Sequence, residues 1–143
     1  MRKTTMIAVV LGLMLTIFAG AAYAKTVNGN NGDNTLRGTN SADTIKGFGG
    51  EDDIFGFGGN DSLYGQGDDD DIVGGSGADF INGGPGEDDF DGNAGNDRIY
   101  AVDRSEDDIN CGPGRDRIVA NPGDDVSSNR EIVQRKGINV DRD

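Results

Sequence analysis

Aspartate recurs at every ninth residue through most of this chain. A carboxylate offers a hard, anionic oxygen, and Ca²⁺ takes six to eight such oxygens from carboxylates and backbone carbonyls. Evenly spaced carboxylates therefore predict a row of cation sites rather than one isolated site. The series begins at Asn34 and continues through Asp43, Asp52, Asp61, Asp70, Asp79, Asp88 and Asp97; after one extra residue it resumes at Asp107, Asp116 and Asp125.

Glycine surrounds these aspartates in a fixed pattern. In residues 74–82, glycine stands at the first, second and fourth places, aspartate at the sixth and a large apolar residue at the eighth. Glycine readily adopts positive φ, so we expect a tight turn over the first six places, with carbonyl groups pointed at a cation. Aspartate and glycine are also good turn residues for purely structural reasons, but that alternative does not explain fixed places in so many copies.

The apolar eighth place predicts the elements that position these turns. Each nine-residue unit has room for a turn and about three residues of strand, and such a strand buries its apolar side chain only against stacked copies. An α-helix is excluded because glycine would interrupt every turn. The series contains Val27, Leu36, Ile45, Ile54, Leu63, Ile72, Ile81, Phe90, Ile99, Ile109 and Ile118, and it fails at the next step, Ser127.

The repeated pattern is G-G-x-G-x-D-x-U-x, in which x is any residue and U is a large apolar residue. It resembles the hemolysin-type (RTX) calcium-binding repeats over about residues 28–126. The resemblance implies an all-β fold, a right-handed parallel β-roll (a solenoid) with two nine-residue repeats in each coil. It also implies several Ca²⁺ ions, each held between the turns of repeats n and n+2. The implied metal ligands are Asp43, Asp52, Asp61, Asp70, Asp79, Asp88, Asp97, Asp107 and Asp116, with Asp43, Asp61, Asp79 and Asp97 in one column and Asp52, Asp70, Asp88 and Asp107 in the other.

Some units depart from the pattern. Asn34 offers an oxygen without a charge, and Asp68 replaces a turn glycine. The segment 102–107 lacks glycine and has one extra residue, so we expect a looped-out turn and a weak or absent site there. The additional acids are expected to face solvent without a necessary ligand role; they are Asp53, Asp69, Asp71, Asp89 and Asp91.

Charge and composition limit the classes of function. Residues 25–143 contain all 26 acidic residues and 11 of the 13 basic ones, a net charge of −15. Nucleic acids and anionic membrane surfaces are poor partners for such a chain. The sequence has no histidine and one cysteine, Cys111, so no intramolecular disulfide can form and no histidine can activate the thiol. We expect a half-buried thiol and no enzymatic activity.

The ends of the chain differ from the repeats. Residues 1–24 read as a secretory signal peptide, with a basic start, an apolar run and the cleavage site Ala22-Tyr23-Ala24. An uncleaved anchor helix is the alternative reading; after cleavage no membrane span is expected. The β-roll is expected over residues 25–119, a C-terminal cap with a closing strand from Asn129 over residues 120–136, and a flexible tail over residues 137–143.

The sequence thus predicts a secreted, extracellular protein that folds when it binds calcium. Its expected role is that of a structural or adhesion module at the cell surface or in the matrix, with glycans or surface proteins as partners. The alternative is an ice- or surface-binding solenoid without catalytic activity. Ice binding favours a flat array of threonines, whereas Thr35 and Thr44 fall on opposite sheets of the expected roll.

Overall fold

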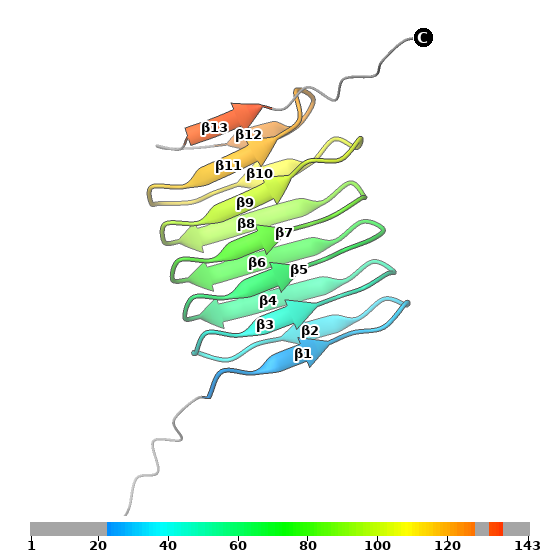
Figure 1. The fold of residues 1–143 in the computed structure, drawn as a ribbon, viewed down its shortest axis with the longest axis vertical. Coiled ribbons are helices and arrows are strands. Elements are labelled where there is room, and N and C mark those ends of the chain that lie inside the picture. Colours follow the sequence, from blue (N-terminus) through cyan, green and yellow to red (C-terminus); the bar gives the residue numbers. More distant parts are fainter. Residues whose placement is uncertain (1–22, 128–131, 136–143) are drawn as a thin grey trace, which may run out of the picture.

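The computed structural model describes residues 23–127 and 132–135, and over these residues every regular element is a β-strand. The strands stack into a roll that rises coil by coil from β1 to β13 (Figure 1). Their bounds are β1 (Thr26–Asn28), β2 (Thr35–Arg37), β3 (Thr44–Lys46), β4 (Asp53–Gly58), β5 (Ser62–Tyr64), β6 (Asp71–Ser76), β7 (Phe80–Asn82), β8 (Asp89–Ala94), β9 (Arg98–Ala101), β10 (Asp108–Asn110), β11 (Arg117–Ala120), β12 (Asp125–Ser127) and β13 (Ile132–Arg135).

Successive strands alternate between two parallel sheets. The odd-numbered strands form a seven-stranded sheet in the order β1-β3-β5-β7-β9-β11-β13, and the even-numbered strands form a six-stranded sheet. Neighbouring strands pair with a shift of two repeats: Ile45 lies opposite Leu63, which lies opposite Ile81. The all-β, right-handed parallel β-roll with two repeats in each coil is therefore confirmed (Figure 1).

The apolar eighth-place residues form the core between the two sheets. Ile45, Ile54, Leu63 and Ile81 are fully buried, and each stacks on the equivalent residue of the next coil because the strands are parallel and in register. A buried isoleucine or leucine contributes about 1.5–3 kcal/mol relative to an exposed one. A three-residue strand gains this stabilisation only as part of the stack, which explains why the apolar series is unbroken.

Three strands are longer than the sequence predicts. β4, β6 and β8 extend into the following turn, where Phe57 pairs with Gly75 and Gly75 pairs with Asn93. The first residues of the turns after β4, β6 and β8 therefore belong to the six-stranded sheet. On that side of the roll these strands are six residues long, not three, and the turns are correspondingly shorter than predicted.

Strand pairing continues through the C-terminal coils although some of their repeats differ in length from nine residues. Ile109 pairs with Val126. The apolar series therefore continues at Val126, one residue before Ser127, the position at which the nine-residue step predicts that the series fails. The closing strand lies at Ile132–Arg135 and pairs with β11. Cys111 is completely buried in the core, not half-buried, and its thiol donates a hydrogen bond to the carbonyl of Ser127.

Several predictions about the ends fall outside the described residues. These are residues 1–22 of the signal peptide predicted over residues 1–24, the start of the expected closing strand at residues 129–131, and the tail over residues 137–143. None of the described residues, 23–127 and 132–135, forms a helix that could span a membrane.

Candidate metal sites in the turns

The sixth-place residues form two columns that run along the roll, one at each edge of the sheets. In both columns, the Oδ1 atom of an aspartate accepts a hydrogen bond from the backbone N–H of the sixth-place residue one coil earlier. Column 1 contains Asp43, Asp61, Asp79, Asp97 and Asp116, joined by bonds of 2.7–2.9 Å; column 2 contains Asn34, Asp52, Asp70, Asp88, Asp107 and Asp124, joined by bonds of 2.9–3.4 Å.

Asp124, rather than Asp125, ends column 2. Asp124 is buried and its Oδ1 accepts the N–H of Asp107 at 3.4 Å. Asp125 is the first residue of β12, is exposed and pairs with Asp108. The nine-residue step predicts Asp125 because it assumes a unit of full length, whereas the last unit is one residue shorter. The signal for Asp124 is the apolar residue Val126, which follows it by two places, as in every regular repeat.

The extra residue before Asp107 is accommodated without moving its carboxylate. Asp107 is 1 % exposed and accepts the N–H of Asp88 at 3.0 Å, so it keeps its place in column 2, next to the turn where the sequence predicts a weak or absent site. Asp103 holds the longer turn together: its Oδ1 accepts from Ser105 and its Oδ2 from Gly86, one coil earlier. The sequence had not singled out Asp103.

The second carboxylate oxygen of most of these aspartates is buried without a hydrogen-bond partner. Unpartnered buried polar atoms are rare in folded proteins because each costs free energy. Here they recur at one position, turn after turn, which points to a cation that the columns are shaped to hold. These atoms are the Oδ2 atoms of Asp52, Asp61, Asp70, Asp79, Asp88, Asp97 and Asp107.

The first-place glycine makes room for this oxygen. A Cβ added at Gly47 would lie 2.1 Å from Oδ2 of Asp52, and one added at Gly83 would lie 2.0 Å from Oδ2 of Asp88. Neither glycine has positive φ, whereas Gly75 and Gly77, at the second and fourth places, do. The prediction of positive φ is therefore wrong for the first place, where close approach of the carboxylate excludes a side chain.

The donor set suits a hard cation that also accepts carbonyl oxygens. Among the described residues, no three acidic, histidine or cysteine side chains converge on one point. A metal between successive turns would thus take one carboxylate from each turn and complete its shell with backbone carbonyls. Ca²⁺ binds in this way, since it tolerates six to eight oxygens in flexible geometry. Two carboxylates balance the charge of a single divalent ion; in a filled column each carboxylate is shared by the ions on both sides.

Burial makes these carboxylates difficult to ionise in the absence of a cation. Desolvation raises the pKa of Asp88 from 3.8 to about 8; the N–H of Asp70 opposes the shift, and the carboxylates of Asp70, Asp107 and Asp103 add to it. Desolvation likewise raises the pKa of Asp70 and of Asp97 to about 7. The metal-free columns are therefore electrostatically unfavourable at neutral pH.

The calcium-free protein should become less stable as pH rises from 5 to 8. Because the folded-state pKa values of Asp70, Asp88 and Asp97 are raised, the folded chain binds more protons than the unfolded chain. This contribution to stability is complete below about pH 4, the unfolded pKa, and is lost as pH rises through the folded values. Circular dichroism of calcium-free protein between pH 5 and pH 8 measures it; strand content that rises with pH would contradict the prediction.

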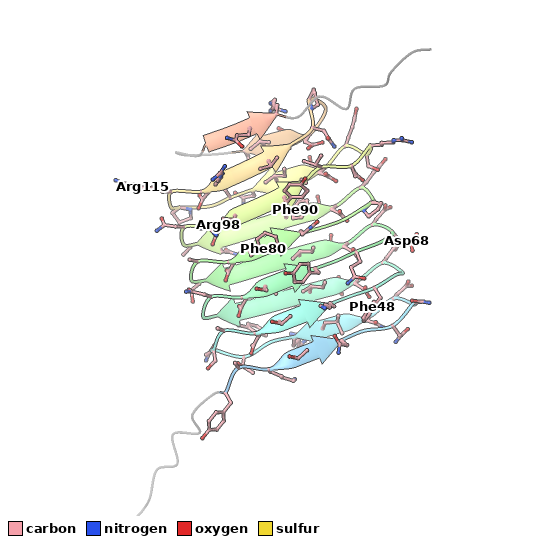
Figure 2. All side chains as sticks on the ribbon, viewed as in Figure 1. Phe48, Asp68, Phe80, Phe90, Arg98 and Arg115 are labelled. Carbon is pink, nitrogen blue, oxygen red and sulfur yellow. The ribbon has the colours of Figure 1, made fainter. Side chains whose placement is uncertain are left out.

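The additional acids lie outside the columns. Asp53, Asp69, Asp71 and Asp89 are exposed, as the sequence predicted, and Asp91 is half-buried. The two edges of the roll that carry the turns have different side chains. Figure 2 shows the acidic Asp68 and the aromatic Phe48 at one edge and the basic Arg115 at the other.

Comparison with known proteins identifies the repeat. The model of the RTX calcium-binding nonapeptide repeat matches residues 28–63, 64–99 and 106–126, and the break falls at the longer turn that contains Asp103. Comparisons with curated proteins and with solved structures gave no match. The family model covers more than half of the chain and agrees with the stacked turns and their paired aspartates, so this chain belongs to the RTX calcium-binding nonapeptide repeat family.

Proposed function

We propose that this protein is a secreted module whose β-roll folds when calcium ions enter the two columns. The ligands are the column aspartates: Asp43, Asp52, Asp61, Asp70, Asp79, Asp88, Asp97, Asp107 and Asp116, together with Asp124. The observation that carries the proposal is the set of seven buried Oδ2 atoms that have no hydrogen-bond partner. Several ions are needed, because each fits between two successive turns of one column.

Calcium supplies the free energy of folding in this proposal. Without a cation, folding removes each column carboxylate from water and places it near the next one along the column, which is unfavourable at neutral pH. A divalent ion between two turns neutralises both carboxylates and gives their unpartnered oxygens a ligand role. Since the sites do not exist in the unfolded chain, binding free energy becomes folding free energy.

Circular dichroism during a calcium titration of the purified chain tests the proposal. We expect a mostly disordered spectrum in chelator at pH 7.5 and a cooperative gain of strand signal as calcium is added. Magnesium at the same concentration serves as the matched control, because its smaller ion requires near-octahedral geometry and should be less effective. A complete strand signal in chelator would contradict calcium-dependent folding.

The proposed role is structural, at the cell surface or in the matrix, without catalysis. The N-terminal signal pattern and the typical export of RTX repeat proteins support secretion. Phe48 and Phe57 are 42 % and 45 % exposed on the turns and could contact a glycan or a surface protein. Binding to a glycan array with calcium and in chelator tests this role; no calcium-dependent binding to any glycan or surface protein would argue against adhesion.

The structure gives little support to ice binding. Along the outer face of the seven-stranded sheet, Thr26 and Thr44 are followed by Ser62 and then by Phe80. On the six-stranded sheet, Thr35 is followed by Asp53 and Asp71. Neither row is an extended array of threonines.

A further inference from the structure

The two columns differ at the fifth place, the residue directly before each column aspartate. All of these fifth-place side chains are exposed. In the regular turns of column 2 every one of them is acidic, and in column 1 none is. The fifth-place residues of column 2 are Asp33, Glu51, Asp69 and Glu87; those of column 1 are Ala42, Asn60, Ala78, Asn96 and Arg115.

The fifth-place side chains occupy equivalent positions in the two columns. In column 2, Oδ1 of Asp33 accepts the N–H of Glu51 at 3.1 Å, and Oδ1 of Asp69 accepts the N–H of Glu87 at 2.9 Å. In column 1, Oδ1 of Asn60 accepts the N–H of Ala78 at 2.9 Å, and Oδ1 of Asn96 accepts that of Arg115 at 2.9 Å. The same hydrogen bond therefore holds a carboxylate beside column 2 and a neutral amide beside column 1.

Further acids gather around column 2. Asp68 accepts the N–H of Gly50, and Asp103 accepts that of Gly86, so both carboxylates are fixed within the turns. An open groove of about 440 Å³ follows this edge; Asp52, which is 1 % exposed with an unpartnered Oδ2, belongs to its lining. The other acidic residues that line the groove are Asp33, Glu51, Asp53, Asp69, Asp71 and Glu87.

The charges around the ligands therefore differ between the two columns. Column 2 is flanked by the carboxylates of its fifth-place residues and of Asp68, whereas no fifth-place residue of column 1 is acidic. A divalent cation in column 2 is thus attracted by fifth-place carboxylates in addition to its own ligands, and one in column 1 is not.

We propose that the two columns are two distinct classes of calcium site, of which column 2 fills at lower calcium concentration and releases its ions last. The inference rests on the proposed calcium-dependent folding and adds to it an order of loading. Unscreened Coulomb attraction between a divalent ion and one or two carboxylates about 8 Å away in water gives a roughly sixfold to thirtyfold lower midpoint for column 2. Salt should reduce the difference, because these outer charges are exposed.

Two existing aromatic residues allow each column to be observed separately. Phe48 and Phe57 occupy the second place of consecutive turns, Phe48 in column 2 and Phe57 in column 1. The chain has no tryptophan, so Phe48→Trp and Phe57→Trp each introduce a single fluorescent reporter. We expect the Phe48→Trp protein to respond at lower calcium, and to lose its signal more slowly when a chelator is mixed in, at low ionic strength.

A charge exchange provides the decisive variant. Asp33→Asn and Asp69→Asn combined with Asn60→Asp and Asn96→Asp leave the net charge and the acceptor at each position unchanged, yet move two charges from column 2 to column 1. The difference between the reporters should then narrow or reverse. The control variant, Asp91→Asn with Asn82→Asp, moves one charge from the residue before a column 1 turn to the residue before a column 2 turn, and should therefore not narrow the difference.

The outcomes separate this inference from the proposed function. If neither reporter responds to calcium and circular dichroism does not change, calcium-dependent folding itself fails. If the protein folds with calcium but both reporters share one midpoint and one release rate, the columns are a single class and the inference is overturned. A difference that persists unchanged after the charge exchange would also overturn it, since the outer charges would not be its cause.

Discussion

Replacing Asp79 with alanine is expected to raise the calcium concentration at the folding midpoint at least about tenfold. Asp79 is 2 % exposed; its Oδ1 accepts the N–H of Asp61 at 2.8 Å, and its own N–H donates to Asp97 at 2.9 Å. It lies between two turns and, in the proposed arrangement, contributes to the ions on both sides. The lost N–H partner alone costs about 1–3 kcal/mol, and 1.4 kcal/mol corresponds to tenfold.

Calcium titrations followed by circular dichroism, with Asp79→Ala and Asp91→Ala compared side by side, measure this effect. Asp91 is half-buried on the outer face of the six-stranded sheet, where its carboxylate accepts a bond of 3.4 Å from Asn110. Asp91→Ala also removes one negative charge, so it matches the change in net charge. Equal shifts in the two variants would show that calcium responds to total charge and not to the columns.

Gly77→Ala is expected to destabilise the calcium-loaded roll by about 3 kcal/mol or more, the upper end of the range for single substitutions. Gly77 has φ of +131°, and an added Cβ would lie 1.7 Å from the carbonyl oxygen of Gly59 in the previous coil. Relief would require the two turns to separate, which would stretch the stack between Asp61 and Asp79. Both the unfolding free energy and the calcium affinity should therefore fall.

Denaturant unfolding at saturating calcium gives the free energy, and Gly67→Ala is the matched control. Gly67 also lies in a turn, but the nearest atom to an added Cβ, the carbonyl oxygen of Phe48, is 3.5 Å away, and its φ is not positive. This control should change stability by less than about 1 kcal/mol. A similar loss in both variants would mean that the general flexibility of glycine, and not the contact between coils, is responsible.

The regular coils could be predicted from the sequence because one spacing serves both the core and the turns. The nine-residue step that places Leu63 under Ile81 also places Asp61 beside Asp79, so finding one series located the other. The role of the first-place glycine could not be predicted in the same way. Sequence alone does not distinguish a glycine required for positive φ from one required for close approach, as at Gly47 and Asp52.

The irregular C-terminal turns could not be predicted because contacts between coils decide them. Asp124 and Asp125 are adjacent in sequence, and either could have ended column 2. Because Val126 pairs with Ile109, β12 begins at Asp125. Asp124 is then the residue directly before the strand, which is the position of a column aspartate. Similarly, the longer turn keeps Asp107 in register because Asp103 accepts a hydrogen bond from Gly86, a contact between residues 17 apart.

The parallel stacking of short strands has a mechanical consequence. Every strand lies across the long axis of the roll, and hydrogen bonds from coil to coil connect residues about 18 apart, as between Asp43 and Asp61 (Figure 1). A pulling force along the axis would therefore act on one coil at the end and leave the others intact. Each detached coil would release about 60 Å of extended chain, at about 3.4 Å per residue. A tether of this design would lengthen in equal steps rather than break at once.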